Sequence, residues 1–429
     1  MITLIMLAAM LLLMIIRVPV SISIGLAAAI GVFMTDTPME LVARSMIGAV
    51  NSFTLLAVPF FVLAGNLMNY VGMTDRIFEF ARRLLGHMHG GLAHVNVGAS
   101  MIFAGMSGTA LADLAGLGAI EIKAMRENGY HPALAASITL ASCTIGVIVP
   151  PSISFIVYCL VTGESTGRLF IAGIIPGFLI GLLLMIYIYA WARIKPQYFQ
   201  PPEKFNLVQL YGATRRSALA LILPFIIVAS LLGGVATPTE VGVIAVAYTL
   251  VIGFIYKVHS IKRLYNAIVQ SATTTALIMY IVAVSAVISW VVTAERSAHE
   301  AAESITKAVG SPLAALGLIN IFLIVAGMVM EGLPALLITA SILYPVVTSI
   351  GIDPVHFGVI ISFNLIIGII TPPMGIGLFI AGRVANVPVD QVLKYSTPFL
   401  IPLLISLAVI TLFPQISLWL PDLLMGPRL

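Results

Sequence analysis

Long apolar runs with almost no charge are the feature that most limits what this chain can fold into. Only 9% of its residues are charged and 60% are hydrophobic, whereas about 25% of a soluble domain is charged. The runs lie near residues 2–16, 18–34, 47–71, 92–119, 132–160, 169–192, 217–233, 239–256, 270–293, 312–346, 355–381 and 397–420. They predict an all-α polytopic integral membrane protein. A transmembrane barrel would show short alternating segments instead.

Four of these runs differ from plain spans. Runs 92–119 and 312–346 are rich in Gly, Ser, Thr or Pro, and runs 132–160 and 355–381 each contain a Pro-Pro pair. We interpret the first two as re-entrant helical hairpins and the other two as broken helices. The resulting threading places five of the 21 Lys and Arg residues outside, namely Arg44, Arg168, Arg296, Lys307 and Arg428. This bias follows the positive-inside rule and puts the other basic residues in the cytoplasm.

The chain also contains an internal repeat. A shift of 222 residues, the difference between 372 and 150, superposes Pro150-Pro151 on Pro372-Pro373 and Gly105-Met106 on Gly327-Met328. In the threading the first hairpin opens to the cytoplasm and the second opens outward, so the repeats are inverted. Inverted repeats with broken helices are typical of secondary transporters whose site lies at mid-membrane. Backbone groups freed by a break must line a cavity or bind an ion, because lipid cannot satisfy them.

Each hairpin carries one acid. The first tip runs from Gly105 to Asp113, and the hydroxyls of Ser107 and Thr109 are hard oxygen ligands that suit Na⁺. Close packing by small residues is the alternative there. Asp113 either caps a half-helix or helps to neutralise an ion. Glu331, in the second hairpin, aligns with Thr109 and is expected to couple to the ion, the alternative being a carboxylate near a hairpin mouth that reaches water.

The broken helices supply the other candidate residues. Pro-Pro removes two N–H donors and leaves carbonyls about one turn upstream unpaired. The half-helix that follows points its positive end into the cavity, which favours a substrate carboxylate. A mere kink is the alternative. The residues concerned are Thr144, Gly146, Val149, Pro150 and Pro151 in one helix, and Asn364, Gly368, Thr371, Pro372, Pro373 and Gly375 in the other. Asn66 and Asn69 also lie on an apolar run, where hydrogen bonding between helices explains them.

Several other functions find little support. No GxxxxGK[ST] phosphate loop occurs, so ATP hydrolysis at a Walker site is excluded. Neither the cysteines nor His87, His89 and His94 form a metal-binding pattern, and no cofactor is expected. Gly105 to Gly108 matches the GxSG around the serine of rhomboid-type intramembrane proteases, which is a weak match in a Gly-rich chain. A passive channel is the other alternative to a secondary transporter.

These motifs together resemble the large membrane subunit, of the DctM type, of tripartite ATP-independent periplasmic (TRAP) transporters. The matching segments are Arg17 to Ser21, Val58 to Gly65, Gly105 to Asp113, Val149 to Ser152 and Thr371 to Gly375. The resemblance covers essentially the whole chain. It implies a Na⁺-driven importer of an organic acid, such as sialic acid or a C4-dicarboxylate, in the bacterial inner membrane. Its implied partners are a small four-helix membrane subunit and a periplasmic substrate-binding protein.

The resemblance also implies an elevator mechanism, in which a transport domain slides against a scaffold. The corresponding units are N-terminal scaffold and arm helices at 1–91, first-repeat transport elements at 92–168, central scaffold helices at 169–269, second-repeat transport elements at 270–395 and a C-terminal helix at 396–429. One implied Na⁺ site lies at Ser107, Thr109, Gly146 and Val149, and another at Glu331, Gly332, Gly368 and Thr371. Gly108, Asp113, Thr144, Pro150, Pro151, Asn364, Pro372, Pro373 and Gly375 complete the candidate sodium and substrate site.

Overall fold

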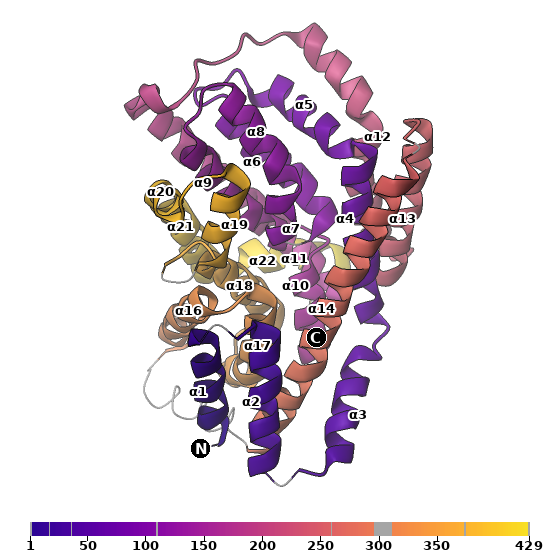
Figure 1. Ribbon diagram of the computed structural model, residues 1–429, viewed down its shortest axis with the longest axis vertical. Coiled ribbons are helices and arrows are strands. Elements are labelled where there is room, and N and C mark those ends of the chain that lie inside the picture. The colour runs from indigo at the N-terminus through magenta and orange to yellow at the C-terminus, as the bar shows by residue number, and fades with distance from the viewer. Residues whose placement is uncertain are drawn as a thin grey trace.

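The computed structural model describes residues 2–16, 18–35, 37–108, 110–258, 260–295, 311–372 and 375–427. Within these ranges the chain is helical and contains no strand (Figure 1). Eight of the described helical stretches are long and apolar enough to cross a membrane. They are Thr54–Val71, Thr166–Ile194, Leu207–Leu231, Pro238–Ile255, Ile261–Ala294, Pro312–Val329, Gly332–Ser349 and Val389–Leu412. The predicted all-α polytopic architecture is therefore confirmed.

One group of helices is organised around α14 (Ile261–Ala294), which extends over most of the molecule in Figure 1. Its 34 residues correspond to about 51 Å at 1.5 Å per residue. Its neighbours are α2 (Val20–Met34), α3 (Met39–Val50), α4 (Ala57–Val71) and α17 (Gly332–Ser349). Helix α1 (Ile2–Ile15) packs on α2, and α13 (Pro238–Ile255) packs on α4. Helix α12 (Leu207–Leu232) contacts both α13 and α5 (Met73–Leu85). The domain boundary predicted between residues 269 and 270 falls inside α14, because no Gly or Pro interrupts the helix there.

The segment from residue 92 to residue 127 doubles back on itself. Helix α6 (Leu92–Ser107) ends at Gly108, whose φ of +71° is left-handed and costs glycine little. The chain then returns through α7 (Ala110–Ala115) and α8 (Leu117–Glu127). The two ends of the segment meet, since the hydroxyl of Tyr130 donates to the carbonyl of Gly90 at 2.7 Å. Burial raises the pKa of Tyr130 to about 12, so this hydroxyl keeps its proton.

A break separates the two helices that follow. Helix α9 (Pro132–Ser142) tightens into the 3₁₀ turn η2 (Cys143–Val147), and helix α10 begins only at Ile153 and ends at Thr162. Ser152 caps α10 by accepting from the N–H of Phe155 at 3.2 Å, and its own hydroxyl donates to the carbonyl of Val147. One carbonyl freed by the break is thus already satisfied within the chain.

The second half of the chain shows matching interruptions. Helix α16 (Pro312–Val329) stops before Met330 and Glu331, after which α17 begins. Helix α18 (Pro354–Gly368) is separated from α19 (Ile376–Ala385) by residues 369–375, of which 373 and 374 are outside the described residues. The remaining elements are α11 (Thr166–Ile194), α20 (Val389–Ser396), α21 (Leu400–Leu412), α22 (Gln415–Met425) and the short turns η1 (Thr54–Leu56), η3 (Pro196–Tyr198) and η4 (Thr397–Phe399).

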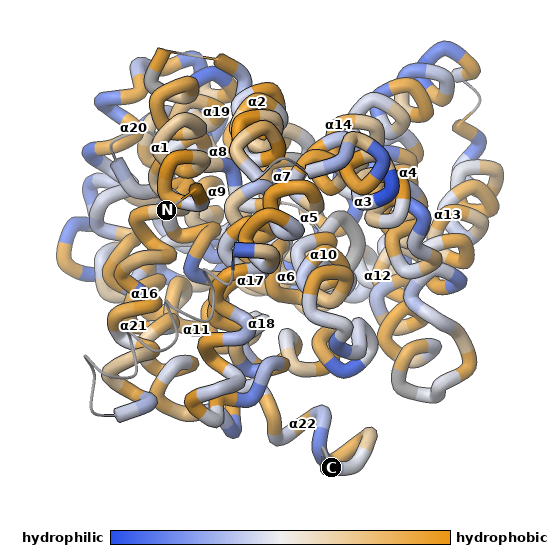
Figure 2. Tube along the Cα trace, turned by 90° about the horizontal axis from the view of Figure 1, so that it is seen from below, coloured by the Kyte–Doolittle hydropathy of each residue, from blue (hydrophilic) through white to orange (hydrophobic). Residues whose placement is uncertain are grey.

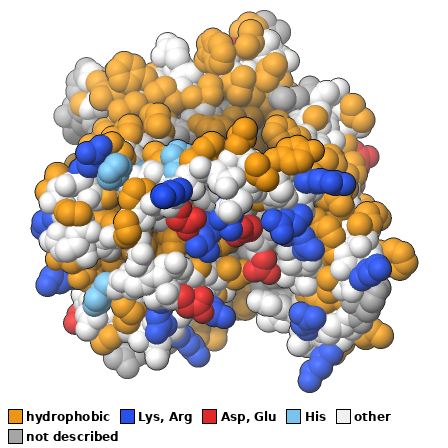
Figure 3. All heavy atoms as spheres, turned by 90° about the horizontal axis from the view of Figure 1, so that it is seen from above, with side chains coloured by type: hydrophobic (Ala, Val, Ile, Leu, Met, Phe, Trp, Pro, Cys, Tyr) orange, Lys and Arg blue, Asp and Glu red, His pale blue; other side chains and the backbone are white. Residues whose placement is uncertain are grey.

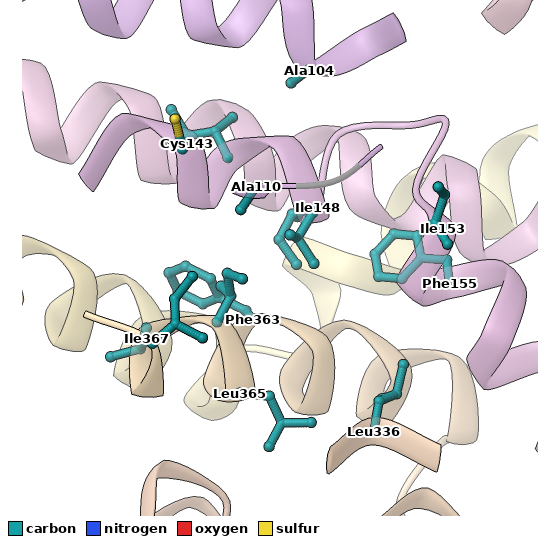
Figure 4. Close-up of a cluster of buried hydrophobic side chains, with 14 of the residues drawn as sticks. Ala104, Ala110, Cys143, Ile148, Ile153, Phe155, Leu336, Phe363, Leu365 and Ile367 are labelled. Atoms are coloured by element: carbon teal, nitrogen blue, oxygen red, sulfur yellow. The ribbon is translucent and has the colours of Figure 1, made fainter. Parts of the chain in front are cut away.

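The core is made jointly by both halves. Figure 4 shows Ile148 and Phe155 of the first half near Phe363 and Leu336 of the second, and all four are buried. Apolar residues also cover much of the outside, as Figure 2 shows along the helices and as the 79% exposure of Phe254 illustrates. Lys and Arg side chains gather on the end seen from above in Figure 3, where α5 and α8 lie in Figure 1. The positive-inside rule assigns that end to the cytoplasm.

Candidate functional site

A cavity of about 520 Å³ lies where the α14 group meets the interrupted helices. Helices α2, α4 and α14 form one wall. The opposite wall is formed by the turn after α6, by α7, and by the start of α17 with the end of α18. Its lining includes Ser21, Asn66, Asn69, Gly108, Asp113, Ser154, Gln270, Thr274, Glu331 and Gly332. Of the candidate site residues, Gly108, Asp113, Glu331 and Gly332 therefore line one cavity.

The turn after α6 touches the break between α9 and α10. The N–H of Ile153 donates to the carbonyl of Gly108 at 3.2 Å. A Cβ added to Gly108 would lie 2.7 Å from the carbonyl oxygen of Pro151, so only glycine fits. The first hairpin tip and the Pro-Pro break are thus brought together, as the sodium-site hypothesis requires. The side chain of Ser107 and the whole of Thr109 lie outside the described residues.

Asp113 reaches the same break from α7. A Cβ added to Gly146 would lie 2.3 Å from Oδ2 of Asp113, which means that the carboxylate rests against the bare backbone of Gly146. Asp113 is only 2% exposed. A carboxylate in such surroundings is costly unless a cation, a proton or hydrogen bonds compensate its charge.

The second pair of interruptions makes a similar junction. A Cβ added to Gly368 would lie 2.3 Å from the carbonyl carbon of Gly327, so the ends of α18 and α16 cross backbone to backbone. Glu331 precedes α17 as its N-cap residue but forms no capping hydrogen bond. Its carboxylate is therefore available to the cavity that it lines.

Other predicted site residues lie around these junctions without lining the described cavity. The hydroxyl of Thr144 donates to the carbonyl of Ala141 at 2.7 Å, and that of Thr371 donates to the carbonyl of Ile367 at 2.8 Å. The side-chain amide of Asn364 donates to Oδ1 of Asn320 at 2.8 Å, which turns it toward α16. Val149, Pro150, Pro151, Pro372 and Gly375 are likewise absent from the lining, and Pro373 is outside the described residues.

Sequence reasoning did not assign the polar residues of α4 and α14 to the site, and it explained Asn66 and Asn69 by hydrogen bonding between helices. Asn66 donates to Oγ of Ser271 at 2.8 Å, and Asn69 accepts from Thr74, so both do bond to neighbouring groups. Both also line the cavity, beside Gln270 and Thr274 of α14. Their spacing of three or four residues places each pair on one helix face. That periodicity of polar residues within apolar runs was the signal available in the sequence.

Glu121 of α8 was also missed. It is 0% exposed, and neither of its side-chain oxygens has a hydrogen-bond partner among the described residues. Asp113 lies near enough for the two carboxyl groups to repel each other when both are charged. Glu121 lies just beyond the apolar run 92–119, and the packing of α8 against neighbouring helices, including α7 and α9, buries it.

The charges of the cavity have one sign. Asp113 and Glu331 are its lining acids, and no Lys, Arg or His is among its lining residues in the described part of the chain. Two carboxylates in a site of low polarity repel each other, and a bound cation reduces this repulsion. Such a cavity therefore attracts a cation. Backbone carbonyls at the two breaks and the side-chain amides of α4 and α14 add further oxygen ligands. The arrangement fits a small hard cation better than nucleophilic catalysis.

Comparison with known proteins identifies the family of the chain. Residues 7–416 match the model of the tripartite ATP-independent periplasmic transporter family, DctM component. The chain belongs to this family. It is 41% identical over 404 residues to the sialic acid TRAP transporter large permease protein SiaM of Vibrio cholerae, with 94% of each chain covered. It is 36% identical to the C4-dicarboxylate TRAP transporter large permease protein DctM of Pseudomonas aeruginosa, over 93% of this chain and 94% of that protein.

A third relative of this TRAP permease is longer. The sialic acid TRAP transporter permease protein SiaT of Haemophilus influenzae is 41% identical over 96% of this chain and 67% of its own length. Among solved structures, the YdaH transporter of Alcanivorax borkumensis matches with a TM-score of 0.56 over 91% of this chain and 90% of that one, at 13% identity. That likeness shows a shared fold alone. The TRAP permease is thus a multi-pass transporter subunit and not an enzyme, so the protease hypothesis is wrong.

Proposed function

We propose that this TRAP permease uses the inward Na⁺ gradient to import an organic acid across the bacterial inner membrane. In this proposal it receives the acid from a periplasmic binding protein and works together with a small membrane subunit. Membership of the family supports secondary transport, and the names of the relatives point to sialic acid or a C4-dicarboxylate as substrate. The coupling to Na⁺ goes beyond these comparisons and rests on the cavity.

The observation that carries the coupling is the pair of acids in a cavity without lining cations. Asp113 and Glu331 come from two different interrupted segments and line the same space. A Na⁺ ion bound near each turn would neutralise the carboxylate at that turn. The carboxylate of the substrate gains from the same ions, because it cannot enter an acid-lined cavity until the acids are neutralised. Ion binding then becomes a condition for substrate binding, which is the essence of symport.

The proposal assigns one ion to each junction. The first ion would bind at Ser107, Thr109, Gly146 and Val149, close to Asp113, and the second at Glu331, Gly332, Gly368 and Thr371. The close approach of Gly108 to Pro151, and of Gly327 to Gly368, supports this assignment, since each brings a hairpin turn to a break where carbonyls lack helical partners. An elevator movement of the interrupted helices against the α14 group would carry the cavity across the membrane.

The test is uptake of radiolabelled sialic acid and succinate into proteoliposomes that contain this chain, its small subunit and its binding protein. We expect accumulation only with an inward Na⁺ gradient and only when every component is present. Replacing Ser107, Thr109 and Glu331 together by Ala should abolish Na⁺-driven accumulation of the acid. Glu127→Gln, at a carboxylate whose side chain is 64% exposed, is the matched control and should leave uptake unchanged.

A passive channel predicts a different outcome. Flux would then ignore Na⁺ and never exceed equilibrium, and the ion roles of both junctions would be withdrawn. Full transport by the triple variant would likewise overturn the proposal, even if the wild type required Na⁺.

A further inference from the structure

A second cavity, of about 400 Å³, continues the first toward the charged end of the molecule. The two cavities share Asn66, Asn69 and Gln270 as lining residues. The second adds Arg263 and Asn266 at the start of α14, together with small and apolar residues of the α7–α8 turn. Together the cavities form one continuous path from the hairpin tips to Arg263, with polar side chains along it.

The path follows a single face of α14. Arg263, Asn266, Gln270 and Thr274 are three or four residues apart, so they form a stripe along one side of the helix. The hydroxyl of Tyr70 lies 3.2 Å from the carbonyl oxygen of Ser260, which fixes the first turn of α14 against α4. The stripe is therefore held in a defined position along the path.

The two cavities differ in charge. Both lining acids, Asp113 and Glu331, belong to the first cavity. Among the described residues, the lining of the second contains Arg263 and no Asp or Glu. No described acidic residue forms an ion pair with the guanidinium of Arg263. The N-terminal end of α14 adds a partial positive charge at the same place. Amide donors of Asn69, Asn266 and Gln270 complete a site suited to an anion.

We propose that the second cavity binds the carboxylate of the transported acid just before the acid is released to the cytoplasm. The inference rests on the proposed function in that it concerns the same substrate. After Na⁺ leaves, the acids of the first cavity repel the carboxylate, and Arg263 with the surrounding amides receives it at the cytoplasmic end. Arg263 thereby acts as a specificity-determining residue for anions, in addition to any role in setting topology.

Lys262 provides the matched control. It is the preceding residue, it carries the same charge, and it is exposed without lining the cavity. In proteoliposomes preloaded with succinate or sialic acid, efflux is measured as a function of internal concentration. Arg263→Gln should raise the half-saturating internal concentration about fivefold, the factor that corresponds to ~1 kcal/mol for one charge pair. Lys262→Gln should leave it unchanged, and Arg263→Lys should restore part of the affinity.

A binding measurement separates this proposal from the coupling to Na⁺. Asn266→Cys is labelled by a membrane-impermeant thiol reagent in the purified permease without Na⁺, while native Cys143 and Cys159 are buried. Succinate or sialic acid should slow labelling of Asn266→Cys and leave Lys262→Cys unaffected. Protection together with Na⁺-independent transport would support carboxylate binding in the second cavity and refute the proposed symport. The proposed carboxylate binding in the second cavity would be overturned if neither acid slowed labelling of Asn266→Cys. Equal efflux kinetics of Arg263→Gln and Lys262→Gln would overturn it as well.

Discussion

Gly146→Ala is the most direct test of the first junction. The added Cβ would lie 2.3 Å from Oδ2 of Asp113, and the nearest other atom within 4 Å is the Asp113 carboxyl carbon at 3.4 Å. Contacts under 3.0 Å are essentially never found, so the carboxylate must move by at least ~0.7 Å, the difference between the two distances. Because the obstructing atom ends a short side chain, the displacement falls on Asp113 rather than on the backbone of the break.

The size of the effect follows from Coulomb's law. With an effective dielectric constant of about 20, moving a carboxylate from ~4 to ~4.7 Å from a monovalent ion costs ~0.6 kcal/mol, or about threefold in affinity. If the carboxylate ligates the ion directly at ~2.4 Å, the same displacement costs ~1.6 kcal/mol, or about fifteenfold. We therefore expect the Na⁺ concentration for half-maximal uptake to rise between about threefold and fifteenfold.

The assay is a Na⁺ titration of uptake, combined with thermal unfolding in detergent. Gly317→Ala is the control, since a Cβ there meets nothing within 4 Å. The double variant Gly146→Ala with Asp113→Ala should bind Na⁺ no more weakly than Asp113→Ala alone, because the effect of the methyl group acts through that carboxylate. Equal Na⁺ dependence of Gly146→Ala and Gly317→Ala would refute the reasoning.

Three further predictions concern stability. Gly368→Ala should cost at least about 1–3 kcal/mol in thermal unfolding, because its Cβ would meet the backbone of Gly327 at 2.3 Å; a melting temperature equal to that of Gly317→Ala would contradict the crossing. Ser152→Ala should cost about 1–2 kcal/mol through loss of the α10 cap, with Ser152→Thr closer to wild type in the same unfolding assay. Glu121→Gln should change stability by less than about 1 kcal/mol, because no donor in the described segments bonds to this carboxyl; a large loss would mean that Glu121 must be ionised.

The interruptions of the helices could be predicted because their causes are local. Gly108 ends α6 through its own backbone freedom, and Pro150 and Pro151 lack the N–H groups that a continuous helix needs. The two intramembrane acids, Asp113 and Glu331, were likewise visible as charges within apolar runs. The sequence alone thus sufficed for the membrane class, the family resemblance and four of the residues that line the cavity.

The other features of the site depend on contacts between segments that are distant in the sequence. Asn66 and Gln270 are far apart in the chain and share a cavity only because α4 packs against α14. Glu121 is buried by neighbouring helices, and Asn364 is turned away from the cavity by Asn320. Helix periodicity assigns such residues to a face, but the partner of that face depends on how all the helices pack. The sequence by itself therefore determined where the helices break and which residues carry charge there. Only the tertiary structure decided which of them meet around one cavity, because that depends on packing between residues remote along the chain.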